Sequence, residues 1–165
     1  MHVYMTNGTL PFLIQLEDKH PNIDFYFMKN SDGILAYYEG SKKKVFASGR
    51  SYQTIESDGN IQPIGFVMMD HIPIQSDSKP VFEEQLPKLK RKLLKAPGLY
   101  AFRILKQRRQ NVYLILSQWD KEASYDAWQE QNSDLFVKKP AYFSNRRFTQ
   151  AYYIIDEETL NEHRK

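Results

Sequence analysis

Residues 112–136 read VYLILSQWDKEASYDAWQEQNSDLF, and the change of pattern inside this stretch determines the fold we expect. The apolar run at residues 112–116 predicts a buried strand. Beyond it, Ala123, Ala127 and Trp128 fall on one face of an amphipathic helix, for which Asp120 is a suitable N-cap. The stretch therefore predicts a strand that leads directly into a helix, with Trp128 at the end of that helix.

The segments on either side complete a ferredoxin-like order of elements. We expect strands at residues 65–75, 99–106 and 148–155, and a helix at residues 81–94 that Pro87 kinks or splits. With the strand and helix of residues 112–136, the order is β-α-β-β-α-β, which is the split βαβ arrangement. The expected fold class is α+β.

The amino-terminal residues predict a second, smaller α+β half. They indicate strands at residues 2–6, 23–28, 34–38 and 45–47, a helix at residues 10–20 and a short helix at residues 50–56. We therefore expect an amino-terminal half at residues 1–63, a ferredoxin-like domain at residues 64–156 and a polar tail at residues 157–165 that frays as a surface helix. Such a chain could close a barrel alone, as a pseudo-dimer, or form a homodimer.

Composition excludes several classes of protein. The chain has 165 residues, of which 41% are hydrophobic, so it is long enough to bury a sizeable core. It contains no cysteine, which excludes disulfides, thiol nucleophiles and cysteine-ligated metals and fits a reducing, cytoplasmic location. No apolar run approaches the length of a membrane span, and the amino terminus does not resemble a signal peptide. We expect a soluble protein without a membrane partner.

A nucleic-acid partner is not expected either. Lys and Arg exceed Asp and Glu only by 23 to 20. Ferredoxin-like folds also build RNA-recognition modules, but the basic-Gly-aromatic signature of those modules is missing from residues 111–118. Lys88, Lys92 and Lys95 are the solvated face of an amphipathic helix whose other face carries leucines.

Three motifs carry a resemblance to a known family. They are APGLYAFRIL at residues 96–105, LILSQWDKEASYDAWQ at residues 114–129 and NSDLF at residues 132–136. With them, residues 65–156 resemble the antibiotic biosynthesis monooxygenase (ABM) family of small ferredoxin-like α+β barrels, and we expect residues 1–63 to form an ABM-like half packed against this domain. The whole chain looks like longer proteins in which an amino-terminal part precedes that domain, namely heme-degrading monooxygenases and signal-transduction proteins of the TRAP type.

For the heme-degrading members, the resemblance implies a porphyrin in a cleft between helices and sheet. Trp128 matches a tryptophan that distorts the porphyrin, and His71 falls where the family has an asparagine near the distal ligand. The family's iron-ligating histidine falls near Lys139 or Pro140, in a segment LFVKKPAY that contains no histidine. Three explanations remain open: His71 binds the iron from the opposite wall, Tyr142 binds it as a phenolate, or the protein does not use heme.

Each candidate residue also has a structural interpretation. Trp128 could be a packed aromatic of the core or of a dimer seam. His71 shares a strand face with Val67 and Met69, which suits either a core position or an apolar pocket, while Asp70 points to the opposite face. The candidate catalytic residues are therefore Trp128 and His71, the heme-binding candidates are His71, Trp128 and Tyr142, and the candidate metal ligand is His71.

The function implied by the resemblance is O2-dependent opening of the porphyrin ring, with release of iron. One alternative is a non-catalytic regulator or ligand sensor of the TRAP type. Another is a monooxygenase that activates an electron-rich substrate towards oxygen without a cofactor. The expected partner is heme or another small molecule in each case.

Overall fold

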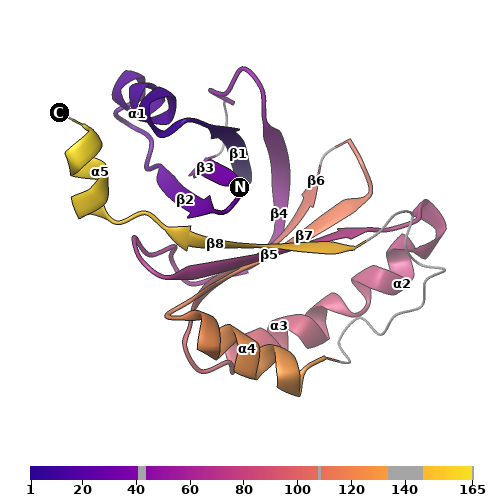
Figure 1. Cartoon of the computed structure of the whole chain (residues 1–165). Helices are drawn as coiled ribbons and strands as arrows, with labels where there is room; N and C mark the ends of the chain where they lie inside the picture. The colour runs from indigo at the N-terminus through magenta and orange to yellow at the C-terminus, as the bar shows by residue number, and fades with distance from the viewer. Residues whose placement is uncertain (41–43, 108, 134–146, 165) are drawn as a thin grey trace.

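The computed structural model describes residues 1–40, 44–107, 109–133 and 147–164, and its strands form one closed antiparallel barrel (Figure 1). The order around the barrel is β1-β3-β2-β8-β5-β7-β6-β4, and β4 pairs back to β1. The strands are β1 (His2–Gly8), β2 (Tyr26–Asn30), β3 (Gly33–Gly40), β4 (Arg50–Asp58), β5 (Phe66–Pro73), β6 (Leu99–Gln107), β7 (Val112–Trp119) and β8 (Phe148–Ile154).

The helices lie outside the barrel in two groups (Figure 1). Helix α1 (Leu10–Lys19) and helix α5 (Glu157–His163) lie together beside the amino-terminal strands. Helix α2 (Lys79–Glu83), helix α3 (Leu86–Leu94) and helix α4 (Glu122–Gln131) lie beneath the sheet formed by β5, β7 and β6. Within the described ranges, every helix is too short or too polar to span a membrane.

The expected α+β, ferredoxin-like order is confirmed for the carboxyl-terminal part. Strand β5 is followed by helices α2 and α3, strands β6 and β7, helix α4 and strand β8. The helix expected at residues 81–94 is split, and Pro87 stands in the first turn of α3, where its missing N–H breaks no helical hydrogen bond.

The expectation of a helix at residues 50–56 is wrong. These residues belong to strand β4, which pairs with β1 on one side and with β6 on the other. Strand β1 pairs with residues 50–53 and β6 with residues 52–58, and this pairing buries Tyr52, so the tertiary partners override the weak local pattern. The strand expected at residues 45–47 is absent as well, and these residues connect to β4 as irregular chain.

The start of α4 also differs from the expectation. The N-cap is Lys121, and the carboxylate of Asp120 instead accepts a hydrogen bond from Ser124 Oγ at 2.6 Å. The Asp120 N–H donates to the carbonyl oxygen of Gly98 at 2.8 Å. Gly98 has φ +84°, and a Cβ there would lie 2.6 Å from Asp120 Oδ1. The APGLY motif therefore holds the start of β6 against the start of α4.

The polar tail is a docked helix. Asp156 caps α5 by accepting a hydrogen bond from the Thr159 N–H at 2.8 Å, and Leu160 is buried. Arg164 donates to both carboxylate oxygens of Glu17 on α1, at 3.0 and 2.8 Å. These contacts fix the carboxyl-terminal helix to the amino-terminal half.

Two apolar clusters lie on the two faces of strand β5. Val67 and Met69 point into the barrel interior, where they pack with residues of the surrounding strands such as Tyr37 and Leu105. Phe66 and Ile72 point outward and pack under helices α2 and α3. The sheet therefore separates a barrel interior from a helix-covered layer.

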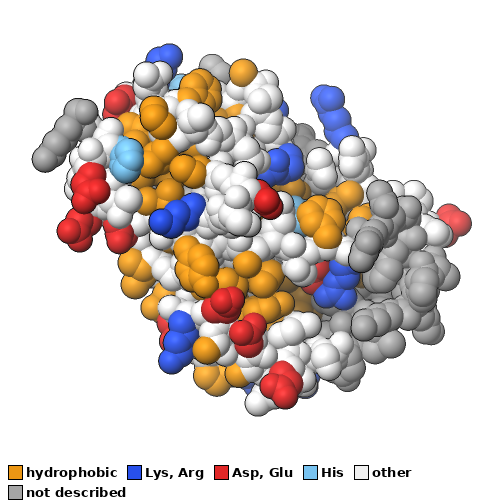
Figure 2. Space-filling view, viewed as in Figure 1, with side chains coloured by type: hydrophobic (Ala, Val, Ile, Leu, Met, Phe, Trp, Pro, Cys, Tyr) orange, Lys and Arg blue, Asp and Glu red, His pale blue; other side chains and the backbone are white. Residues whose placement is uncertain are grey.

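Helix α4 covers its side of the sheet incompletely. Helix α3 contributes three buried leucines to the layer, whereas no side chain of α4 is fully buried. Figure 2 shows hydrophobic side chains at the surface along the line where α4 meets β8, a region in which Ile64 and Tyr153 are exposed. Helix α4 is thus held to the sheet by fewer apolar contacts than α3.

A buried ion pair joins the amino-terminal half to the carboxyl-terminal half inside the barrel. Arg103 on β6 donates to Glu39 on β3, with Nε 2.6 Å from Oε2, and the Arg103 side chain is 5% exposed. Arg103 also donates to the carbonyl oxygens of Asp58 and Gly59 at 3.1 and 2.9 Å. The guanidinium therefore connects β6, β3 and the end of β4.

We predict that Arg103→Met lowers the free energy of unfolding by about 3 kcal/mol, because it leaves the Glu39 carboxylate without its cationic partner and removes the donors to three carbonyl oxygens. Urea denaturation measures this loss. The matched control is Lys90→Met, which breaks the exposed Lys90–Glu56 pair and should cost less than about 1 kcal/mol. Equal losses in the two variants would contradict the assigned role of Arg103.

Candidate functional site

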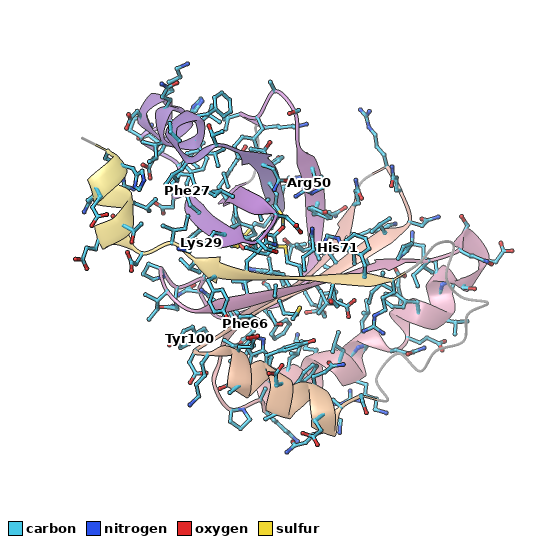
Figure 3. The ribbon with its side chains drawn as sticks, in the orientation of Figure 1. Phe27, Lys29, Arg50, Phe66, His71 and Tyr100 are labelled. Atoms are coloured by element: carbon cyan, nitrogen blue, oxygen red, sulfur yellow. The ribbon has the colours of Figure 1, made fainter. Side chains whose placement is uncertain are left out.

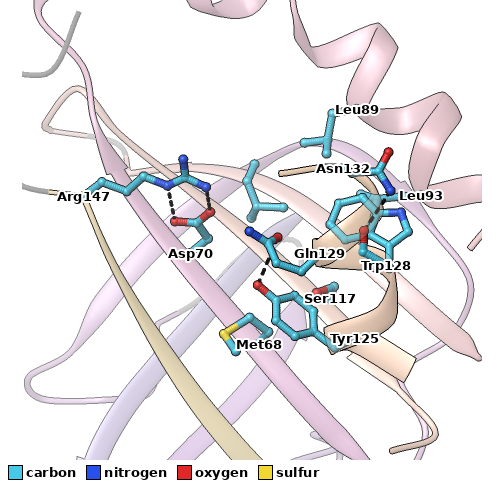
Figure 4. A pocket seen from close by; sticks show the side chains of 11 residues that line it. Met68, Asp70, Leu89, Leu93, Ser117, Tyr125, Trp128, Gln129, Asn132 and Arg147 are labelled. Carbon is cyan, nitrogen blue, oxygen red and sulfur yellow. Dashed lines mark hydrogen bonds and ion pairs between the residues drawn. The ribbon is translucent and has the colours of Figure 1, made fainter. Parts of the chain in front are cut away.

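A small cavity lies between helices α3 and α4 and the outer face of strands β5 and β7 (Figure 4). Its volume is about 30 Å³, enough for about one water molecule. The wall combines apolar and aromatic side chains with a few polar groups, as is usual for ligand sites. The lining residues are Met68, Asp70, Leu89, Leu93, Ile115, Ser117, Tyr125, Trp128, Gln129, Asn132 and Arg147.

Trp128 lies in the last turns of α4, as expected, and its indole forms part of the cavity wall. The ring centre is 5.8 Å from that of the buried Trp119, and Nε1 is 3.3 Å from the carbonyl oxygen of Lys92, to which it donates. The side chain of Asn132 donates to the Trp128 carbonyl oxygen at 2.9 Å. Trp128 is therefore positioned by both helices rather than free on the surface.

The polar wall of the cavity is an ion pair between β5 and the start of β8. Arg147 donates to both carboxylate oxygens of Asp70, through Nε at 2.9 Å from Oδ1 and through Nη2 to Oδ2. The hydrogen bond to Asp70 raises the pKa of Arg147 above its ordinary value. The Asp70 side chain is 14% exposed and the Arg147 side chain is 26% exposed, so the pair lies at the border of the cavity and solvent.

Tyr125 brings a phenol to the same wall. Burial, with a smaller contribution from Asp70, raises the pKa of Tyr125 to about 12, so its hydroxyl remains protonated at neutral pH. The hydroxyl is 3.4 Å from Gln129 Oε1, to which it donates. In this state Tyr125 can donate a hydrogen bond to a ligand but is a poor anionic ligand for a metal.

His71 lies on the other face of strand β5, in the barrel interior, as its register with Val67 and Met69 predicts (Figure 3). Its Nε2 is 3.0 Å from Gln150 Oε1, and its ring stacks on Phe148 with centres 4.4 Å apart. The structure therefore does not bring His71 and Trp128 together. The residues of β5 that face the Trp128 cavity are Met68 and Asp70.

The other predicted ligand position lies outside the described residues. Tyr142, Lys139 and Pro140 belong to residues 134–146, which the structure does not describe. In the described ranges, no group of three or more His, Asp or Glu side chains gathers to hold a metal ion. The cavity itself carries no histidine among its described lining residues.

Comparison with known proteins finds a family match in the carboxyl-terminal part. Residues 65–136 match the family model described as antibiotic biosynthesis monooxygenase. The resemblance to the ABM family is confirmed. This ABM segment contains β5, β6, β7 and α4, and therefore both Asp70 and Trp128.

Curated relatives extend over most of the chain. A heme-degrading monooxygenase from Listeria monocytogenes is 27% identical over 128 residues, which cover 78% of this chain and 77% of the relative. The signal transduction protein TRAP from Staphylococcus epidermidis is 24% identical over 136 residues, which cover 82% of this chain and 80% of the relative. Both matches reach beyond the ABM segment.

A solved structure shows the same fold. The structure of a major regulator of staphylococcal pathogenesis superposes with a TM-score of 0.84 at 22% identity, over 94% of this chain and 100% of that chain. The agreement covers the amino-terminal half as well as the ABM segment, so the single-chain barrel is an arrangement that the two proteins share.

Sequence reasoning missed the polar wall of the site. The alternation of side chains along β5 could have placed Asp70 on the helix-covered face, because Phe66 and Met68 share its face and pack under the helices. Arg147 carries no such signal, since it lies 77 residues after Asp70 and reaches it only through the pairing of β8 with β5. The site is therefore a cleft of mixed polarity, with apolar and aromatic side chains, several neutral polar groups and one ion pair on its border.

The burial of His71 predicts a pH dependence of stability. Burial lowers the pKa of His71 in the folded state, and Arg50 acts in the same direction, so the unfolded chain binds a proton more readily. Stability should therefore fall as the pH decreases below about 6.5, the ordinary histidine value. Urea denaturation at pH 7 and pH 5 should show a smaller difference for His71→Gln than for the unmodified protein. An equal difference in the two proteins would contradict the role assigned to His71.

Proposed function

We propose that this chain is a monooxygenase of the ABM type that acts on a flat aromatic molecule held between α4 and the sheet, and that this molecule is heme. The observation that carries the proposal is the position of Trp128, whose indole forms the wall of the cavity within the ABM segment. The Listeria relative, named as a heme-degrading monooxygenase, supports the choice of heme. Opening of a porphyrin ring would consume O2 and electrons from a reductant and release iron.

A porphyrin can enter only if the cavity widens, because the present volume of about 30 Å³ is far below that of a ligand pocket. Helix α4 is the wall that we expect to move. It has no fully buried side chain, whereas α3 is anchored by Leu86, Leu89 and Leu93. Displacing α4 therefore costs less buried apolar contact than displacing α3.

The lining residues suit distinct parts of a porphyrin. Trp128 would pack on the ring and press it out of plane as α4 closes. The guanidinium of Arg147 lies at the solvent border and is suited to a propionate carboxylate. It would then bind two carboxylates, that of Asp70 and that of the propionate. His71 is on the wrong face of β5 for this ligand, so we assign the axial donor to Tyr142, from residues 134–146 outside the described ranges.

Hemin titration with visible spectroscopy, followed by ascorbate in air, tests the proposal. We expect a saturable Soret shift at one equivalent and its decay with release of iron. Trp128→Phe should slow the decay by about tenfold or change the product, because a smaller ring presses less on the porphyrin. His71→Gln is the matched control and should leave the Soret band unchanged.

Two other results would contradict the proposed function and indicate a different one. A Soret shift that His71→Gln abolishes and Trp128→Phe leaves intact would place the porphyrin on the other face of the sheet. Saturable binding without decay would indicate a heme sensor, the class that the TRAP relative suggests.

The small cavity favours a second candidate, a cofactor-independent oxygenase for a smaller electron-rich aromatic substrate. A cavity of about 30 Å³ needs less widening for one or two rings than for a porphyrin, and the protonated Tyr125 can donate a hydrogen bond to a substrate hydroxyl. The absence of any saturable Soret shift would favour this candidate. Native mass spectrometry of the purified protein would then look for a co-purified aromatic molecule.

A further inference from the structure

The barrel has an open mouth at the end where β1, β4, β5 and β8 carry Asn7, Arg50, His71 and Phe148. Two adjoining pockets lie there, with volumes of about 530 and 730 Å³, and they share Arg50, Gln107 and Gln110. The mouth is on the opposite face of the sheet from the Trp128 cavity, and Figure 3 shows Arg50 and His71 on that side. It is large enough for a small organic molecule.

The charges around the mouth are of one sign. Arg50, Arg109 and Lys44 line the two pockets, and none of the described lining residues is acidic. Asp32 lies nearby in the turn between β2 and β3, where it adds to the mainly burial-driven rise in the pKa of Tyr152, but it lines neither pocket. The pockets should therefore attract anions.

Arg50 is the cation best placed to bind an anion. Its Nη1 donates to Asn7 Oδ1 at 3.2 Å, and among the described residues it has no carboxylate partner. The hydrogen bonds to Asn7 and to the Tyr52 side chain orient the guanidinium, and the Arg50 side chain lines both pockets. An arginine held in this way suits the two oxygens of a carboxylate or phosphate.

An aromatic surface lies beside this arginine. The rings of His71 and Phe148 stack at an interplanar angle of 8°, and Phe148 is 50% exposed. His71 is fixed by Gln150, and its lowered pKa keeps it neutral at pH 7. The exposed side of Phe148 therefore offers a ring surface that is costly to leave in water.

We propose that the barrel mouth is a second binding site, which takes a small aromatic molecule carrying a carboxylate or a phosphate. The anionic group binds the guanidinium of Arg50, and Arg109 and Lys44 contribute attraction at longer range. The ring of the ligand packs on Phe148. Gln107, Gln110 and Gln150 supply neutral hydrogen-bonding groups around it.

Isothermal titration calorimetry with phenyl phosphate, benzoate, inorganic phosphate and benzylamine tests this site. We expect saturable binding of phenyl phosphate, of benzoate or of both, and the comparison of the two identifies the preferred anionic group. Benzylamine, which carries the opposite charge, should not bind. Affinity should decrease as the salt concentration rises, because the attraction depends on exposed charges.

Variants assign the two parts of the ligand to residues. Arg50→Gln should weaken binding by about tenfold or more through loss of charge-assisted hydrogen bonds. Arg50→Lys keeps the charge and should retain part of the affinity if both variants fold, which urea denaturation checks. Phe148→Leu should weaken binding of phenyl phosphate but not of inorganic phosphate, and Asp32→Asn should tighten binding of both.

Arg91→Gln is the matched control, since Arg91 is exposed on α3, across the sheet from the mouth. It should leave all affinities unchanged. Binding that Arg50→Gln and Arg91→Gln weaken equally would reflect net charge alone and would overturn the site. Binding of benzylamine as tight as that of phenyl phosphate, or the absence of saturable binding by both aromatic anions, would overturn it as well.

Discussion

The pairing of sheet edges is the constraint on which the rest of the structure depends. Taken alone, the ABM segment with β8 would be a sheet of β8-β5-β7-β6 that exposes the backbone groups of β8 and β6. The amino-terminal half supplies β2 to pair with β8 and β4 to pair with β6, and β1 and β3 close the ring. One chain thus removes both open edges. The Arg103–Glu39 pair then holds the two halves together from inside the barrel.

Closure of the barrel gives strand β5 two buried faces with different surroundings. Successive side chains of a strand point to opposite faces. Met68 and Asp70 therefore face the helices and the Trp128 cavity, whereas Met69 and His71 face the barrel interior and its mouth. Two chemically distinct pockets can use one strand because the packed sheet separates them. One is a cleft of mixed polarity under α4, and the other is a basic mouth across the sheet.

The sequence was informative where the pattern is local. The spacing of Ala123 and Trp128 predicted α4, Pro87 predicted the break between α2 and α3, and the order of elements predicted the ferredoxin-like fold. Strand β4 was missed because its stability comes from β1 and β6, which are distant in sequence. The overall fold could therefore be predicted from the sequence, whereas the strands of the amino-terminal half could be predicted only in part.

The candidate site could be predicted from the sequence only in part, because it too depends on pairing between strands that are distant in sequence. Trp128 could be found from a motif, but the Asp70–Arg147 pair exists only because β8 returns to lie beside β5. His71 was paired with Trp128 in the sequence interpretation because both fall at positions that the resemblance assigns to the heme site, although the family has an asparagine where this chain has His71. The pleat of β5 separates them, and a shift of one residue along a strand changes the face that a side chain occupies.

The central claim is that an aromatic ligand of the ABM site binds on the helix-covered face of β5 and not inside the barrel. Methyl NMR of the adjacent Met68 and Met69 tests it directly, because the two methyl groups lie on opposite faces of one strand. With gallium protoporphyrin IX, a diamagnetic analogue of hemin, the account predicts a large shift of the Met68 methyl signal and a much smaller one for Met69. A larger shift at Met69 than at Met68 would contradict it.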